Sequence, residues 1–176
     1  TSVAAYHGYN YLLARENLTD HLEKKDKQGK IRQRLLKIRA KKVILATGAL
    51  ERPLIFNNND RPAIMLSSAV KKYADFYGVI CGQKTVFFTN NDSAYESAFC
   101  LHNKGIKVEA IIDIRDNSNS KIVKAVKEAG IKIYWSHAIV DTVGYKRLNS
   151  VSIMKLSNDG TSVTGSKISI SCDCLG

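Results

Sequence analysis

The chain has 176 residues, of which 44% are hydrophobic and 24% are charged, so it can bury a core and is neither disordered nor membrane-spanning. Nothing at its start resembles a signal peptide. The cysteines form no Cys-x-x-Cys pair and no metal-ligand spacing with the histidines, which argues against a structural metal site. We therefore expect a cytoplasmic protein with reduced thiols and no bound metal.

The net charge of +11 is concentrated in the first part of the chain, because residues 1–43 alone carry a net +7. A basic block of this kind can bind phosphates or nucleic acid. It can also be the solvated edge of a β-hairpin, where lysines oppose sheet-to-sheet association. The run at residues 24–30 is typical of a loop tip and lacks interleaved aromatic residues, so we favour the hairpin and do not expect nucleic acid as a partner.

Three β-prone segments, residues 2–6, 9–14 and 32–38, predict a β-meander around this basic loop. Residues 43–46 then form an apolar run that is typical of a strand buried on both faces. The small residues that end this run let another backbone or a flat cofactor approach closely, and ligands bind at the carboxyl ends of strands in open α/β sheets. Ala46, Thr47 and Gly48 are therefore candidate cofactor-binding residues.

After a polar loop at residues 57–62, the periodicity predicts a helix from Ser67 or Ser68 to Tyr77, ended by Gly78. An apolar strand at residues 84–88, a polar turn, a helix-period segment and a second apolar strand ending in Asp113 follow. This order is the βαβ pattern of a dinucleotide-binding fold. The fold class is therefore α/β, with a Rossmann-like parallel sheet.

The turn of this unit is unusual, because Thr89 and Asn91 stand where the dinucleotide fingerprint has its first two glycines. Asn tolerates a positive φ, whereas the β-branched Thr does so poorly. Asp113 lies where an acid can accept a hydrogen bond from a ribose hydroxyl. Two interpretations stay open: a Rossmann-like unit whose own turn holds no nucleotide, or a working site made by the residues Thr89, Asn90, Asn91, Asp92, Ser93 and Asp113.

The pattern continues with a turn at residues 116–120, a helix at residues 121–129 and a third strand at residues 131–135. Strands near residues 138–143, 151–156 and 167–174 predict a β-hairpin tail. We assign residues 1–62 to an incomplete first dinucleotide-binding domain and residues 63–176 to a Rossmann-like second domain truncated in its last strand. The absence of an initial Met and the cut-off strand lead us to expect a piece of a longer protein.

Three stretches of the sequence resemble the α subunits of heterotetrameric sarcosine oxidases, within the superfamily of flavoproteins with two dinucleotide domains. They are Ile44-Leu45-Ala46-Thr47-Gly48-Ala49-Leu50-Glu51-Arg52-Pro53, Asn59-Asp60-Arg61-Pro62-Ala63-Ile64-Met65-Leu66 and Phe88-Thr89-Asn90-Asn91-Asp92-Ser93-Ala94-Tyr95. The third is the most specific, because it replaces a glycine fingerprint with residues rarely found there. Ala63 departs from the Gly usual in the family.

The resemblance implies an NAD site whose glycine-rich motif lies upstream of Thr1 and whose far wall is Ala46-Thr47-Gly48. It also implies FAD, FMN and tetrahydrofolate in the complete complex, and β, γ and δ subunits as partners. The implied activity is oxidation of N-methylglycine, an oxidoreductase reaction on a CH–NH donor, with no catalytic residue in this chain. A related proline- or opine-oxidising dehydrogenase is the nearest alternative, and a non-catalytic scaffold or a basic nucleic-acid module are alternatives from other classes.

Overall fold

The computed structural model describes residues 2–176 and divides the chain into two compact units, Thr1–Ala49 and Leu50–Gly176. Each unit is described by itself. Our assignment of residues 1–62 and 63–176 to two dinucleotide-domain parts remains a prediction, and the division into compact units falls earlier in the chain than that boundary.

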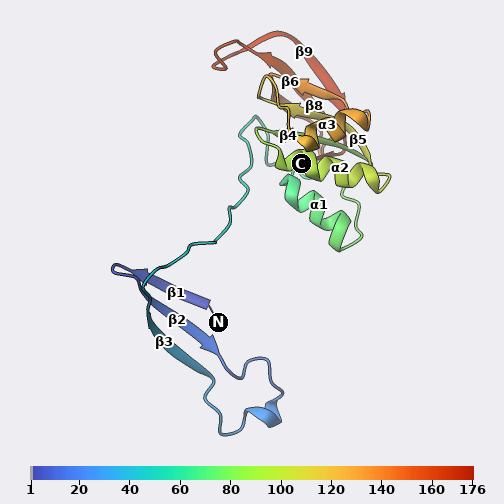
Figure 1. Cartoon of the computed structure of the whole chain (residues 1–176). Helices are drawn as coiled ribbons and strands as arrows, with labels where there is room; N and C mark the ends of the chain where they lie inside the picture. Colours follow the sequence, from blue (N-terminus) through green and yellow to red (C-terminus); the bar gives the residue numbers. More distant parts are fainter. Residues whose placement is uncertain (1) are drawn as a thin grey trace. The chain divides into compact units, whose positions relative to one another are not determined.

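The first unit is a three-stranded antiparallel sheet in the order β1-β2-β3, which is the β-meander predicted from the sequence (Figure 1). Its elements are β1 (Ser2–His7), β2 (Tyr11–Asn17), the short 3-10 helix η1 (Lys24–Lys27) and β3 (Gln33–Arg39). The basic run thus lies at the tip of the β2–β3 connection, where its charged groups face water.

Register divides the side chains of this sheet between two faces. Leu12 pairs with Ile38 and Ala14 with Leu36, while Leu13 pairs with Lys37. Paired residues share a face and successive residues alternate, so these aliphatic pairs lie on one side together with Arg34, while Lys37 and Arg39 lie on the other. Ala14 and Thr19 are buried in this unit, so the sheet has little core of its own.

The strand predicted at residues 43–46 is not formed in the structure. Residues 42–50 run outside any strand or helix, with Ile44 91% exposed and Leu45 73% exposed. A strand requires a hydrogen-bonded neighbour, and the described strands of this unit pair only among themselves. The apolar run therefore lies in solvent in this chain.

The second unit is built on a parallel sheet in the order β10-β4-β5-β6. Its strands are β4 (Lys84–Thr89), β5 (Lys107–Asp113), β6 (Ile133–Trp135) and β10 (Cys174–Leu175). Phe87 lies beside Ile111 in the parallel ladder of β4 and β5. The predicted α/β class and its central βαβ unit are confirmed.

Three helices cover one face of the sheet (Figure 1): α1 (Ser67–Phe76), which precedes β4, and the two connecting helices α2 (Ser93–Asn103) and α3 (Lys121–Glu128). Their starts and stops follow the sequence signals. The Ser120 hydroxyl accepts a hydrogen bond from the Val123 amide and caps α3, and Gly78 and Gly130 have the positive φ that ends a helix. The inward side chains pack on Phe87 and Ile111, with Tyr95 fully buried among them.

The opposite face of the parallel sheet is covered by an antiparallel sheet in the order β7-β8-β9. Its strands are β7 (His137–Val143), β8 (Ser150–Leu156) and β9 (Val163–Ser171). A second core forms between the two sheets, where Val86 and Ile112 meet Ile139, Val151 and Ile153. The layers are thus helices, parallel sheet and antiparallel sheet.

The prediction of one strand at residues 167–174 is wrong, because these residues belong to two strands, β9 and β10 (Cys174–Leu175), of different sheets. β9 ends at Ser171, and the chain turns so that Cys174 and Leu175 join the parallel sheet beside Thr85 and Val86. The Asp173 carboxylate stabilises this turn by accepting hydrogen bonds from the amides of Gln83 and Lys84. The prediction had joined β9 and β10, which are adjacent in sequence but belong to different sheets, into one strand.

Residues 50–66 are anchored to the second unit at both ends. The Glu51 carboxylate accepts hydrogen bonds from the Ser67 amide at 3.0 Å and the Ser68 amide at 3.0 Å, and thus caps α1 from outside the helix. Burial opposes ionisation of Glu51, but hydrogen bonds from both serines outweigh it and lower its pKa. At the other end, Asn57 and Asn58 donate to Asp141 in β7.

Gly82→Ala tests the fit of the turn before β4. A Cβ at Gly82 would lie 2.6 Å from the Asp173 carboxylate and 2.6 Å from the Cys174 side chain, so we expect a loss of about 1–3 kcal/mol in unfolding free energy. Denaturant unfolding followed by fluorescence of Trp135, the single Trp, measures it. Gly8→Ala is the control, because nothing lies within 4 Å of its Cβ position, and equal losses in both variants would contradict the packing argument.

Glu51→Ala tests the cap on α1 and carries a pH dependence. We expect a loss of about 1 kcal/mol at neutral pH, because two helix-terminal amides lose their acceptor. Since the folded pKa is lowered, the charged cap stabilises above the unfolded value of 4.5, and its contribution disappears as the pH falls through the folded pKa. Urea unfolding across this range should show the two proteins converging in acid, and the exposed Glu128→Ala should show no such loss.

Candidate functional site

The Thr89–Ser93 turn and Asp113 meet at the carboxyl edge of the parallel sheet, as the βαβ pattern predicted. Thr89 ends β4 and lies beside Asp113, which ends β5. The turn leads directly into α2, with Asp92 as the residue that precedes the first helical turn. Parallel strands deliver their last residues to the same edge, which is the position of ligands in open α/β sheets.

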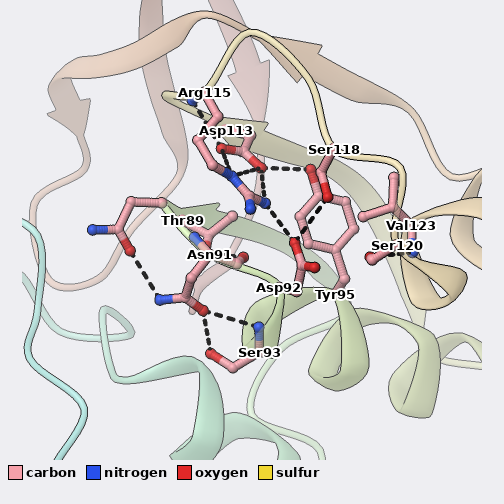
Figure 2. A network of polar contacts seen from close by, with 11 residues as sticks. Thr89, Asn91, Asp92, Ser93, Tyr95, Asp113, Arg115, Ser118, Ser120 and Val123 are labelled. Carbon is pink, nitrogen blue, oxygen red and sulfur yellow. Dashed lines mark hydrogen bonds and ion pairs between the residues drawn. The ribbon is translucent and has the colours of Figure 1, made fainter.

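The turn satisfies its own polar groups. The Thr89 hydroxyl accepts from the Asn91 amide at 3.1 Å and donates to the Asn91 carbonyl at 2.9 Å. The Asn91 side-chain oxygen accepts from the Ser93 amide at 2.9 Å and from the Ser93 hydroxyl at 2.6 Å, while its amide group donates to Asn90 (Figure 2). Side chains of the turn therefore already bind the backbone amide of Asn91 in the turn and that of Ser93, the first residue of α2.

Asp113 is fully buried, and its carboxylate accepts hydrogen bonds from four donor groups. Arg115 donates to its carboxylate from Nε at 3.0 Å, from Nη2 at 2.7 Å and from its backbone amide at 2.9 Å. The Tyr95 hydroxyl donates the fourth at 2.7 Å. Burial and the bond to Asp113 both raise the pKa of Tyr95, so its hydroxyl stays protonated and remains a donor.

Arg115 joins this buried acid to the start of α2. Its Nη2 lies 2.8 Å from a carboxylate oxygen of Asp92, which also accepts a hydrogen bond from the Ser118 hydroxyl at 3.2 Å (Figure 2). Burial opposes the ionisation of Asp92, but bonds from Arg115, Ser120 and Ser118 outweigh it and lower its pKa. The bond to Asp113, followed by that to Asp92, raises the pKa of Arg115. Asp92 is therefore ionised at neutral pH, and one guanidinium bridges the two acids.

Sequence reasoning found the two acids and missed the side chains that bind them, Arg115, Tyr95 and Ser118. Tyr95 lies one turn into α2 and stacks on Trp135 with ring centroids 6.1 Å apart. An Arg two residues after a strand-ending acid is a signal that could have indicated an internal ion pair, since both side chains then lie near the same sheet edge.

Several groups of this turn that a dinucleotide would contact are already bound within the chain, and the nucleotide site predicted here stays a prediction. A pyrophosphate is held there by free backbone amides at the helix start, and a ribose by an acid with free acceptor capacity. Here the amides of Asn91 and Ser93 are engaged, and the carboxylate of Asp113 has all four bonds filled. Asp92 also places a negative charge beside the start of α2.

Ala46, Thr47 and Gly48 belong to the other compact unit and lie in the exposed segment after β3. Gly48 has a φ of 70°, and nothing lies within 4 Å of its Cβ position. These three residues are small and open to solvent, so a flat cofactor would meet no steric obstacle from neighbouring atoms.

The His137 ring and the two buried cysteines, Cys172 and Cys174, pack against other parts of the chain. The His137 ring contacts the Trp135 carbonyl at 2.6 Å and packs edge-on against Tyr134. Burial raises the pKa of both Cys172 and Cys174 to about 12.

Across residues 2–176, no three His, Cys, Asp or Glu side chains gather into a metal site. No helix in that same range is long and apolar enough to cross a membrane.

Comparison with solved structures identifies the fold. A thioredoxin reductase from T. acidophilum superposes with a TM-score of 0.56 over 81% of this chain and 46% of its own, at 18% identity. An FAD-dependent pyridine nucleotide-disulphide oxidoreductase from Desulfovibrio vulgaris gives 0.53 over 98% of this chain and 40% of its own, at 12% identity. This chain therefore shares the fold of parts of FAD- and pyridine-nucleotide-dependent oxidoreductases.

Sequence comparison gives a narrower relationship, although no family model matches the chain. The α subunit of sarcosine oxidase from Corynebacterium sp. (strain P-1) is 40% identical over 161 residues, 90% of this chain and 16% of that relative. The α subunit from Rhizobium meliloti (strain 1021) is 47% identical over 83 residues, 47% of this chain and 8% of that relative. The resemblance seen in the sequence is thereby confirmed, and over nearly its whole length this chain is a sequence relative of one segment of the sarcosine oxidase α subunit.

Proposed function

We propose that this chain is a segment of the α subunit of an amine-oxidising flavoenzyme complex whose substrate is N-methylglycine. The observation that carries the proposal is the 40% identity to a sarcosine oxidase α subunit over 90% of the chain. The chain spans 16% of that relative's length, so the activity belongs to the complex rather than to these residues. Its role there is to bind a dinucleotide and to present surfaces to the β, γ and δ subunits.

The dinucleotide, which we propose to be NAD, would lie against Ala46, Thr47 and Gly48. Their small side chains and exposed backbone allow the close approach that a flat cofactor needs. NAD would supply hydride-accepting chemistry, whereas these residues would only hold it. FAD, FMN and tetrahydrofolate would be held by other parts of the complex.

The apolar face of the first unit supports a scaffolding role. Leu12, Ala14, Leu36 and Ile38 share one side of the β1–β3 sheet, which has almost no core within its own unit. A contiguous apolar sheet face is stable in water only when something covers it. Neighbouring parts of an assembled subunit would provide that cover.

Gly48→Ala in the complete α subunit tests the proposed NAD position. We expect at least a tenfold loss of NAD affinity, because a Cβ would both strain a residue at φ 70° and enter the cofactor's contact surface. Calorimetric titration with NAD measures the affinity, and oxygen consumption with N-methylglycine reports activity of the assembled complex.

Gly160→Ala is the matched control, because Gly160 also has a positive φ and open space at its Cβ position but lies in the β8–β9 turn. It should retain NAD. Unchanged NAD affinity in Gly48→Ala would contradict the proposed position, and lack of activity toward N-methylglycine in an intact wild-type complex would contradict the proposed substrate.

The thiols give a separate prediction about redox chemistry. Burial raises the pKa of Cys172 and Cys174, so both stay protonated and unreactive at neutral pH, and they cannot serve as a dithiol acceptor. Iodoacetamide should leave them unmodified in the native chain and label all four cysteines after unfolding, as mass spectrometry of the peptides would show. Rapid native labelling of either residue would show that a reactive thiolate exists.

A further inference from the structure

The carboxyl edge of β4 and β5, where a Rossmann fold receives a nucleotide, is occupied in this chain by its own side chains. Four elements contribute: the turn after β4, the first turn of α2, the end of β5 and the loop before α3 (Figure 2). The loss of the glycines is not the only change at this edge. A bound nucleotide would place a negative charge at the helix start and hydrogen-bond donors at the acid that ends β5, and here side chains of the chain itself supply both.

The first substitute is the carboxylate of Asp92. The start of an α-helix favours a negative charge, because its unpaired amides and the helix dipole both give that end a partial positive charge. Asp92 precedes the first residue of α2. Its side chain accepts no hydrogen bond from the α2 amides, but bonds from Arg115 and Ser118 keep it ionised and fixed at the helix start. Its charge would oppose a phosphate at the same place.

The second substitute is the guanidinium of Arg115. An ionised carboxylate has about four acceptor positions, and in Asp113 they are filled by Tyr95 and three donors of Arg115. Because Asp113 is 0% exposed, its charge requires a partner. Arg115 provides that partner, and together with Tyr95 it takes up the acceptor positions that ribose hydroxyls would need.

We propose that the nucleotide position of the β4–α2–β5 unit is permanently self-occupied, with Asp92 standing in for the pyrophosphate and Arg115 for the ribose. Arg115 is then a positioning residue that fixes α2, β5 and the loop before α3 relative to one another. The second domain keeps the architecture of a dinucleotide domain while excluding the dinucleotide. This inference rests on the geometry of the edge and is independent of where NAD binds elsewhere.

An NMR titration of the full chain with NAD, and separately with ADP, tests the exclusion residue by residue. We expect no saturable shift at the backbone amides of Asn90, Asn91, Ser93 and Arg115 at millimolar ligand. Shifts confined to Thr47 and Gly48 would support both this inference and the proposed NAD wall. A saturable shift at the amides of the turn would overturn the inference and leave the family relationship standing.

A double-mutant cycle tests whether Asp92 and Arg115 act as one unit. Asp92→Asn and Arg115→Gln are compared singly and together by thermal unfolding, and we expect Arg115→Gln to lower Tm by roughly 10 °C, because it leaves the buried Asp113 unpaired. The double variant should lose less than the sum of the single losses, since the substituted groups share one network.

Lys107→Gln is the matched control, since it removes a cation at the start of β5 that also pairs with a nearby acid, Glu109. The Lys107 side chain is 64% exposed. This substitution should change Tm little. Additive losses at Asp92 and Arg115, or an equal loss in the Lys107 control, would overturn the assigned role of Arg115. The titration of the wild-type chain decides the question of exclusion even if an Arg115 variant fails to fold.

Discussion

A fully buried carboxylate is the constraint around which the second unit is arranged. Asp113 ends the central strand β5 with no exposure to solvent, and a charge in that position is costly unless it is paired and fully hydrogen-bonded. Arg115 and Tyr95 meet that need from a loop and a helix. Since Arg115 reaches on to Asp92, one ionic requirement fixes the relative positions of three elements that follow one another in the chain.

The central βαβ unit could be predicted because its signals are local. Apolar runs of strand length, a polar turn and helix-period spacing all occur within residues 84–113, and parallel pairing of Phe87 with Ile111 followed from the right-handed crossover that such an order requires. The glycine that ends α1, Gly78, could also be predicted, because a glycine stop acts within a few residues of the helix end.

What could not be predicted depends on partners that are distant in sequence or absent from it. The run at residues 43–46 has the composition of a buried strand, but no described strand lies beside it, so composition alone gave the wrong state. The boundary between β9 and β10 depends on Asp173 finding amides about ninety residues earlier. At the site, both acids could be identified from the sequence. The hydrogen bonds from Arg115 to Asp113 could not, because they depend on side-chain conformations that residue spacing does not determine.

The placement of β10 has a consequence for the order in which the molecule assembles. Cys174 pairs with Thr85, and the whole β7–β8–β9 sheet lies between them in the sequence. Closing so long a loop is entropically expensive and slow compared with forming hairpins or local βαβ contacts. We infer that the ladder of β4, β5 and β6 and the β7–β8–β9 sheet form first, and that the outermost strand, β10, pairs with β4 last.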